Sequence, residues 1–282
     1  KLVKESPDGN TFNTMGDLYL KKGDKRPAVE FFHKAADFFR AEGFSLKALA
    51  LYKKIINIEP MDAGALVGLG ELSEEKGLIT DAIKNYLSAA DTLSKGLTND
   101  ANREKFISIY ERIIHLAPGN IPLREKIAGL FSKEGFLVDA IREYLFIARA
   151  YENKGDAEQA KGYLRKVIDL QPDNREAFVS LSHIFEKTDN LQQAFDCLQE
   201  AMKTHRNDLD LLLRCAKLLK RSDRYDEALG YLSQALELNP SDLDAQRLTG
   251  DLHLARGDRG RAWESYQRVI DHLLKENKID TA

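Results

Sequence analysis

Residues 15–35 read MGDLYLKKGDKRPAVEFFHKA, and residues 249–269 read TGDLHLARGDRGRAWESYQRV. Each segment has a glycine at its second position, Gly16 and Gly250, and another glycine seven residues later. An alanine follows at twelve residues from that first glycine and an aromatic residue at sixteen. The same residue types at the same offsets near both ends of the chain indicate an internal repeat, and the spacing predicts two helices joined by a turn.

The pattern starts from nine small residues, which we call the anchors. Successive anchors are separated by 20, 34, 20, 38, 20, 34, 34 and 34 residues, and they are Gly16, Ala36, Gly70, Ala90, Ala128, Ala148, Ser182, Ala216 and Gly250. A recurring step of 34 residues predicts an array in which each repeat is one helix–turn–helix. Helices cross closely only where side chains are small, so we expect eight of the nine anchors to face the alanine that stands twelve residues later.

Turn and cap residues recur in register with the anchors. Glycine commonly stands seven residues after an anchor, where it ends a helix in the left-handed conformation, and Asp189 and Asp223 take its place in two repeats. Prolines close four of the units, and Asp or Asn follows each within two residues: Pro60, Pro118, Pro172 and Pro240. We expect these acids and amides to cap the next helix.

The three steps of 20 residues predict helices that belong to two repeats at once. The second helix of one repeat then serves as the first helix of the next, and three helices form one unit. We therefore predict three-helix units over 9–62, 63–120 and 121–174, and two-helix repeats over 175–208, 209–242 and 243–276. The middle unit has four additional residues, which we place in a longer loop at 97–102. Residues 1–8 read as the tail of a preceding repeat and 277–282 as a short tail.

This pattern resembles the tetratricopeptide repeat family, from about Asn10 to about Glu276. The resemblance rests on the two segments quoted above and on YLSQALELNPSD at 231–242. It implies an all-α fold, a right-handed α-solenoid of helix–turn–helix repeats. It also implies a non-catalytic scaffold that binds a protein or peptide partner in a concave groove lined by the first helices.

Composition limits the function further. The formal net charge of −3 gives no general attraction to nucleic acid, and no run of apolar residues is long enough to span a membrane. Cys197 and Cys215 are expected to be buried free thiols, which favours a reducing, cytoplasmic compartment. The ends look like those of a fragment, and association of two copies through exposed terminal helices is possible.

No pattern of catalytic or metal-binding residues is evident. The six histidines form no metal pair with another His or Cys at helical spacing, and no glycine-rich phosphate loop or strained nucleophile turn is present. We therefore expect no enzyme activity, no metal and no cofactor.

The candidate binding residues come from the resemblance, which places them on the inward side of the first helices. In the last three repeats they form a basic cluster, and we name as groove residues His183, Lys187, Lys217, Lys220, Arg221 and Arg247. Such a cluster would hold an acidic segment through charge-assisted hydrogen bonds. The alternative is a solvated face of mixed charge. The corresponding positions in the first half lean acidic: Asp17, Asp37, Glu71, Glu74 and Glu75.

Three functions stay open at this point. The first is the interaction scaffold, with an acidic peptide bound in the C-terminal half. The second is a regulatory or targeting part of a larger enzyme, or of a secretion, pilus or motility assembly. The third is RNA binding by a related helical repeat, which the acidic balance and the lack of a continuous basic stripe disfavour.

Overall fold

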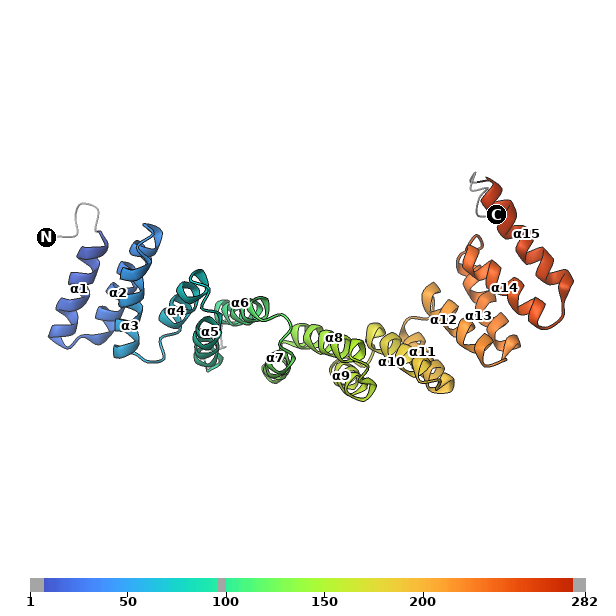
Figure 1. The fold of residues 1–282 in the computed structure, drawn as a ribbon, viewed down its shortest axis with the longest axis horizontal. Coiled ribbons are helices and arrows are strands. Elements are labelled where there is room, and N and C mark those ends of the chain that lie inside the picture. Colours follow the sequence, from blue (N-terminus) through green and yellow to red (C-terminus); the bar gives the residue numbers. More distant parts are fainter. Residues whose placement is uncertain (1–7, 96–99, 276–282) are drawn as a thin grey trace. The chain divides into compact units, whose positions relative to one another are not determined.

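The structure, a computed structural model, describes residues 8–95 and 100–275. Over these residues the chain forms α-helices α1 to α15 joined by short turns, with no β-strand (Figure 1). The chain divides into two compact bodies, an N-terminal body of residues 1–124 and a C-terminal body of residues 125–282. The division falls inside α7, and each body is described separately below.

The described residues of the N-terminal body form six complete helices, and each packs against the next along the chain. They are α1 (Gly9–Lys22), α2 (Lys25–Ala41), α3 (Ser45–Ile58), α4 (Ala63–Glu75), α5 (Ile79–Ser94) and α6 (Asp100–Leu116). Helix α7 (Ile121–Lys133) follows.

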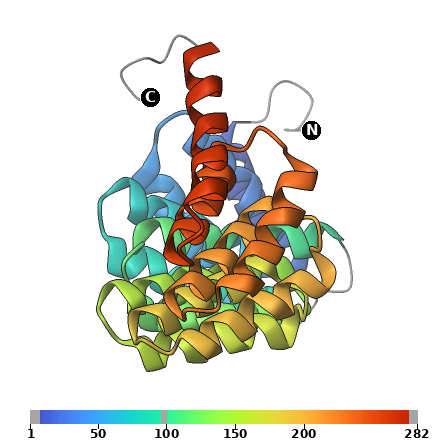
Figure 2. The same cartoon turned by 90° about the vertical axis from the view of Figure 1, so that its right-hand side faces the viewer.

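The C-terminal body continues with eight helices. They are α8 (Leu137–Asn153), α9 (Ala157–Leu170), α10 (Arg175–Lys187), α11 (Leu191–Thr204), α12 (Leu209–Arg221), α13 (Tyr225–Leu238), α14 (Leu243–Ala255) and α15 (Arg259–Lys275). Neighbours in sequence pack side by side, as α14 and α15 do in Figures 1 and 2. The all-α repeat fold expected from the sequence is confirmed.

One local expectation needs correction. The additional residues of the middle unit were expected in a loop at 97–102, but residues 100–102 form the first turn of α6. Alanine, asparagine, arginine, glutamate and lysine follow Asp100 without a glycine or proline to stop the helix, so the helix starts at Asp100. Residues 97–99 lie outside the described residues. The grouping of helices into three-helix units and two-helix repeats stays an interpretation.

Local chemistry explains where the helices begin and end. Asp189 and Asp223 have φ of 57° and 56°, as glycines do at the corresponding turns, which confirms their expected role. The residues that follow the four prolines cap the next helices: Asp62 accepts from the Ala65 amide at 2.7 Å and Asp242 from the Ala245 amide at 2.8 Å. Asn120 and Asn174 make the same bond to Leu123 and Ala177.

At the three glycine anchors an aromatic ring lies closest to the helix, and the expected contact with the alanine twelve residues later stays a prediction. At Gly16, Gly70 and Gly250 an added Cβ would lie 2.5–2.6 Å from a ring carbon of Phe32, Tyr86 or Tyr266, so the anchor glycine faces the aromatic residue sixteen positions later. The reason is volume, since a flat ring can approach the helix axis only where no side chain stands. The alanines twelve residues after the anchors are themselves buried in the core: Ala28, Ala48, Ala82, Ala140, Ala160, Ala194, Ala228 and Ala262.

Candidate interaction surface

The first helices of successive repeats in the C-terminal body present one row of charged side chains. We call this row the first-helix face. It consists of the polar residues one, four and five positions after the anchors on α8, α10, α12 and α14: Arg149, Glu152, His183, Glu186, Lys187, Lys217, Lys220, Arg221 and Asp251. The anchors are buried, so residues at these offsets lie on a shared side of each helix.

Ion pairs connect this face from one repeat to the next. Glu152 Oε1 lies 2.9 Å from both His183 Nδ1 and Lys187 Nζ. The Arg221 guanidinium donates to Glu186 at 3.2 Å. Each pair joins a residue four positions after one anchor to a residue one or five positions after the next. The rule holds again where the Lys220 ammonium donates to Asp251 at 2.7 Å.

Five of the six predicted groove residues therefore have acidic partners. His183, Lys187, Lys220 and Arg221 pair across repeats, and Arg247 pairs with Asp244 on its own helix at 3.3 Å. Lys217 is exposed and makes no ion pair within the described part of the chain. The cluster is thus a surface of mixed charge, in which Lys217 carries an unmatched positive charge.

The acidic members of the face have pKa values that reflect these contacts. Burial opposes ionisation of Glu152, but hydrogen bonds and charge from Lys187 and His183 outweigh it and lower its pKa. Burial likewise opposes ionisation of Asp251, and Lys220 together with the Tyr266 hydroxyl lowers its pKa. Both carboxylates are therefore ionised at neutral pH. The cationic side chains are about one third to two thirds exposed, so each pair contributes only about 0–1 kcal/mol to stability.

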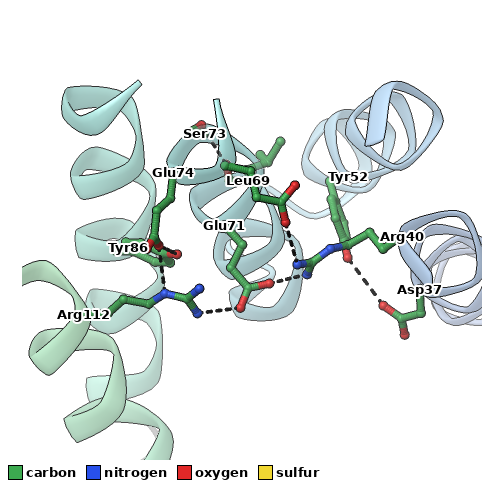
Figure 3. A network of polar contacts seen from close by, with 10 residues as sticks. Asp37, Arg40, Tyr52, Leu69, Glu71, Ser73, Glu74, Tyr86 and Arg112 are labelled. Carbon is green, nitrogen blue, oxygen red and sulfur yellow. Dashed lines mark hydrogen bonds and ion pairs between the residues drawn. The ribbon is translucent and has the colours of Figure 1, made fainter. Parts of the chain in front are cut away.

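Four of the five acidic positions of the N-terminal body are matched by cations, whereas Asp37 accepts a hydrogen bond from the Tyr52 hydroxyl at 3.4 Å (Figure 3). Glu71 accepts hydrogen bonds from Arg40 on α2 and from Arg112 on α6, the latter at 2.8 Å. Glu74 accepts from Arg112 and from the Tyr86 hydroxyl, each at 2.8 Å. Lys54 pairs with Asp17 and Arg40 with Glu75. The acidic residues predicted in the first half of the chain therefore do not form a surface of unpaired negative charge. Cations on the second and third helices pair with most of them.

A cation on the third helix reaches back to the first helix in each predicted three-helix unit. Lys54 on α3 pairs with Asp17 on α1, and Arg112 on α6 with Glu71 and Glu74 on α4. Lys166 on α9 lies 3.9 Å from Glu125 on α7. Each cation also lies over the aromatic ring sixteen positions after the unit's first anchor, at 4.2 Å (Phe32), 5.5 Å (Tyr86) and 5.3 Å (Tyr144). We call these three residues the third-helix cations.

The remaining titratable groups to consider are the possible metal ligands and the two cysteines. Within the described residues no group of three or more His, Cys, Asp and Glu side chains could hold a metal ion. Burial raises the pKa of Cys215 to about 12 and, with help from nearby Asp196 and Glu200, that of Cys197 to about 11. Both are free thiols and stay protonated at neutral pH. Cys215 is buried as expected, whereas Cys197 is only partly buried.

Comparisons with known proteins agree with the fold. Family models described as tetratricopeptide repeat match residues 10–41, 143–174 and 213–272. No curated protein matches the chain. These three segments are tetratricopeptide repeats, as the sequence pattern led us to expect. No helix within the described residues is long and apolar enough to cross a membrane.

Several solved structures are similar to this chain at low identity. A crystal structure of MamA is 17% identical, covers 74% of this chain and 97% of its own, and has a TM-score of 0.45. MamA residues 41–end from Desulfovibrio magneticus RS-1 is 16% identical, with 54% and 94% coverage and a TM-score of 0.42. YrrB, described as a TPR protein with an unusual peptide-binding site, is 18% identical, with 78% and 91% coverage and a TM-score of 0.40.

Proposed function

We propose that the chain is a non-catalytic scaffold that binds a peptide segment of a partner protein along the first-helix face of α10, α12 and α14. Tetratricopeptide repeats in the three matched segments support an interaction scaffold. The observation that carries the location is the exposed Lys217, which has no ion-pair partner among the described residues, whereas the other charged residues of the first-helix face are paired. An acidic side chain of the peptide is placed opposite this ammonium.

The paired charges around Lys217 define what else the peptide needs. Glu186 and Arg221 on one side, and Lys220 and Asp251 on the other, offer both acceptors and donors at the surface. These ion pairs are partly exposed and individually weak. A carboxylate of the peptide can therefore replace Glu186 as the partner of Arg221, or Asp251 as the partner of Lys220, at a small cost in free energy. The peptide that fits is therefore acidic at one position and of mixed charge around it.

The test is a displayed peptide library selected against the chain, followed by fluorescence anisotropy on the enriched peptide. Lys217→Glu is expected to weaken binding about tenfold, since a charge-assisted hydrogen bond becomes a repulsion. Lys203→Glu is the matched control, because Lys203 is an exposed lysine on α11 and off this face. Equal weakening by both variants, or enriched peptides without acidic residues, would contradict the proposal.

Two further expectations stay proposals. The free thiols fit a reducing, cytoplasmic compartment. Association of two copies through terminal helices would involve exposed apolar residues such as Leu18 on α1 and Trp263 on α15.

A further inference from the structure

An apolar groove of about 270 Å³ lies where α3, α4 and the start of α5 meet in the N-terminal body. Four leucines line it, namely Leu49 of α3, Leu69 and Leu72 of α4, and Leu78, the residue before α5. On α4 these leucines stand one residue before and two residues after the anchor Gly70, whereas Glu71 and Glu74 stand one and four residues after it. With about 3.6 residues per turn, the two sets lie on opposite sides of the helix. The groove is therefore separate from the acidic residues that pair with Arg112.

The small side chain of Ser73 leaves room for the groove. Ser73 lines it and stands three residues after its anchor. At the other eight anchors a larger side chain has this place, and these residues are Tyr19, Phe39, Leu93, Phe131, Tyr151, Phe185, Leu219 and His253. The Ser73 hydroxyl donates to the Leu69 carbonyl oxygen at 2.7 Å, so it stays against its own helix (Figure 3). Among the nine anchors, this one alone lacks bulk at this position.

The corresponding place in the C-terminal body, where α9 meets α10, is filled by the chain itself. Phe185 stands where Ser73 would be, and Lys161 stands where Leu49 would be. Phe185 packs against the core of that body, and the Lys161 ammonium lies 5.2 Å from the centre of its ring. The Lys161 side chain is only 13% exposed, so little of this place is open to solvent. The groove beside Ser73 thus has room for one large apolar side chain from another molecule.

Three lysines surround the groove without acidic partners. Lys53 of α3, Lys76 at the end of α4 and Lys84 of α5 line it, are exposed, and make no ion pair within the described part of the chain. Asp81 is the one acid among the lining residues, which leaves a net charge of +2 around the groove. The three residues at the corresponding places on α9, α10 and α11 carry no net charge: Arg165, Thr188 and Asp196. The excess of positive charge therefore distinguishes this groove from its counterpart.

We propose that this groove docks an acidic segment of a partner protein, in which one large apolar side chain stands between carboxylates. The apolar side chain takes the place of the ring that Ser73 lacks, and its burial among the leucines supplies the affinity. The carboxylates pair with the three lysines and give the site its charge selectivity. An anionic membrane is a poorer match, because a membrane-binding surface projects its apolar side chains, whereas these leucines line a hollow. This docking site is additional to the peptide site on the first-helix face.

The test is an NMR titration of the chain carrying isotope labels in its leucine methyl groups. The probe is acetyl-Glu-Glu-Phe-Glu-Glu-amide. One control replaces the phenylalanine by alanine, and the other replaces the four glutamates by glutamine. Saturable shifts of the Leu69 and Leu78 methyl groups are expected with the probe. Each control peptide is expected to bind about fivefold more weakly or worse, because it lacks either the buried ring or the charges.

Variants of Ser73 test whether the hollow itself is the site. Ser73→Phe is expected to weaken binding about tenfold or more, because the new ring occupies the groove as Phe185 does in the C-terminal body. Ser73→Ala is the matched control, since it leaves the groove open and is expected to bind the probe as the native chain does. Full binding by Ser73→Phe with an unchanged helical circular dichroism spectrum would overturn the proposal.

Variants of exposed lysines test the charge independently of whether a ring fits at Ser73. Lys76→Gln is expected to weaken binding about threefold. Lys25→Gln on α2, outside the groove, and Lys217→Glu on the first-helix face are expected to leave it unchanged, so this proposal and the proposed function fail independently. Equal shifts with the glutamine peptide would overturn the proposal. Binding to phosphatidylglycerol vesicles that Lys76→Gln abolishes, without shifts from the probe, would overturn it in favour of a membrane.

Discussion

The predicted three-helix units and the two-helix repeats stabilise their first helices by different contacts. In the former, a third-helix cation such as Arg112 crosses an aromatic ring and binds acids of the first helix. In the repeats over 175–208 and 209–242, Leu198 and Leu232 stand where the ring would be, and the repeat as predicted has no third helix to supply such a cation. Their first-helix charges pair with the neighbouring repeat instead.

This difference in ion pairing follows from whether one helix is shared by two repeats. When one helix serves two repeats, the first and third helices pack on the same helix and come within reach of each other. A long cationic side chain then bridges them and covers the ring between with its apolar stem. We propose the grouping of the chain into units on this physical basis, and the variants below test it.

The largest effect is expected where the ring meets its anchor. Gly70→Ala places a Cβ 2.6 Å from a ring carbon of Tyr86, which is fully buried and cannot move away. We expect a loss of about 2–3 kcal/mol in the free energy of unfolding, measured by urea denaturation. Gly162→Ala on α9 is the control, because nothing lies within 4 Å of its Cβ. That variant is expected to be more stable by up to about 1 kcal/mol. Equal effects of both would contradict the packing described.

A smaller effect is expected from removing a third-helix cation. Arg112→Met retains most of the apolar stem but leaves Glu71 and Glu74 with fewer partners, so we expect a loss of about 1–2 kcal/mol. The matched change in a two-helix repeat, Arg221→Met, should cost about 0.5 kcal/mol or less because its ion pairs are longer, 3.2 and 3.7 Å against 2.8 Å for both pairs of Arg112. Amide hydrogen exchange would locate the first loss to α4 and α6. Similar losses in both variants would remove the distinction.

A pH-dependent contribution is expected from His33 on α2, which lies 3.0 Å from the capping carboxylate Asp62 of α4. The hydrogen bond to Asp62, opposed by burial, raises the pKa of His33 above its usual value of 6.5. The bond therefore stabilises the fold fully below pH 6.5, and the effect is lost as pH rises through the raised pKa. At pH 6 the free energy of unfolding of the native chain should exceed that of His33→Gln by less than about 1 kcal/mol, and this difference should disappear by pH 8. A constant difference between pH 6 and 8 would contradict this.

The smallest effect is expected at Lys217. The side chain is exposed and makes no ion pair with the described residues, so Lys217→Glu should change the free energy of unfolding by no more than about 0.5 kcal/mol. Urea denaturation checks this, and a large loss would show that the lysine has a structural role.

The fold could be predicted because its signals are local. A glycine or aspartate at a left-handed turn and an Asp or Asn cap act within a few residues, so Asp189, Asp223 and Asp62 were identified from spacing alone. The segment 97–102 was harder. A polar stretch next to a glycine suits a loop or the first turn of a helix, and residues 100–102 form a helical turn.

The candidate surface could be predicted only in part. Repeat spacing placed His183, Lys187 and Lys220 on α10 and α12, but their acidic partners are 31–35 residues away on neighbouring helices. Whether two such charges meet depends on how the helices pack, which spacing does not give. One signal was available: an acid four residues after an anchor, with a cation five residues after the next, predicts the Glu152–Lys187 and Glu186–Arg221 pairs.

The most direct test is a pair of double-mutant cycles, one for Glu71 with Arg112 and one for Glu186 with Arg221. Each cycle uses Glu→Gln and Arg→Met, and the free energy of unfolding is measured by urea denaturation at low and high salt. A coupling of about 1 kcal/mol or more is predicted for the first pair and about 0.5 kcal/mol or less for the second, with stronger screening by salt in the second. Equal coupling in the two regions would contradict the claim that a shared helix binds the first helix to the third.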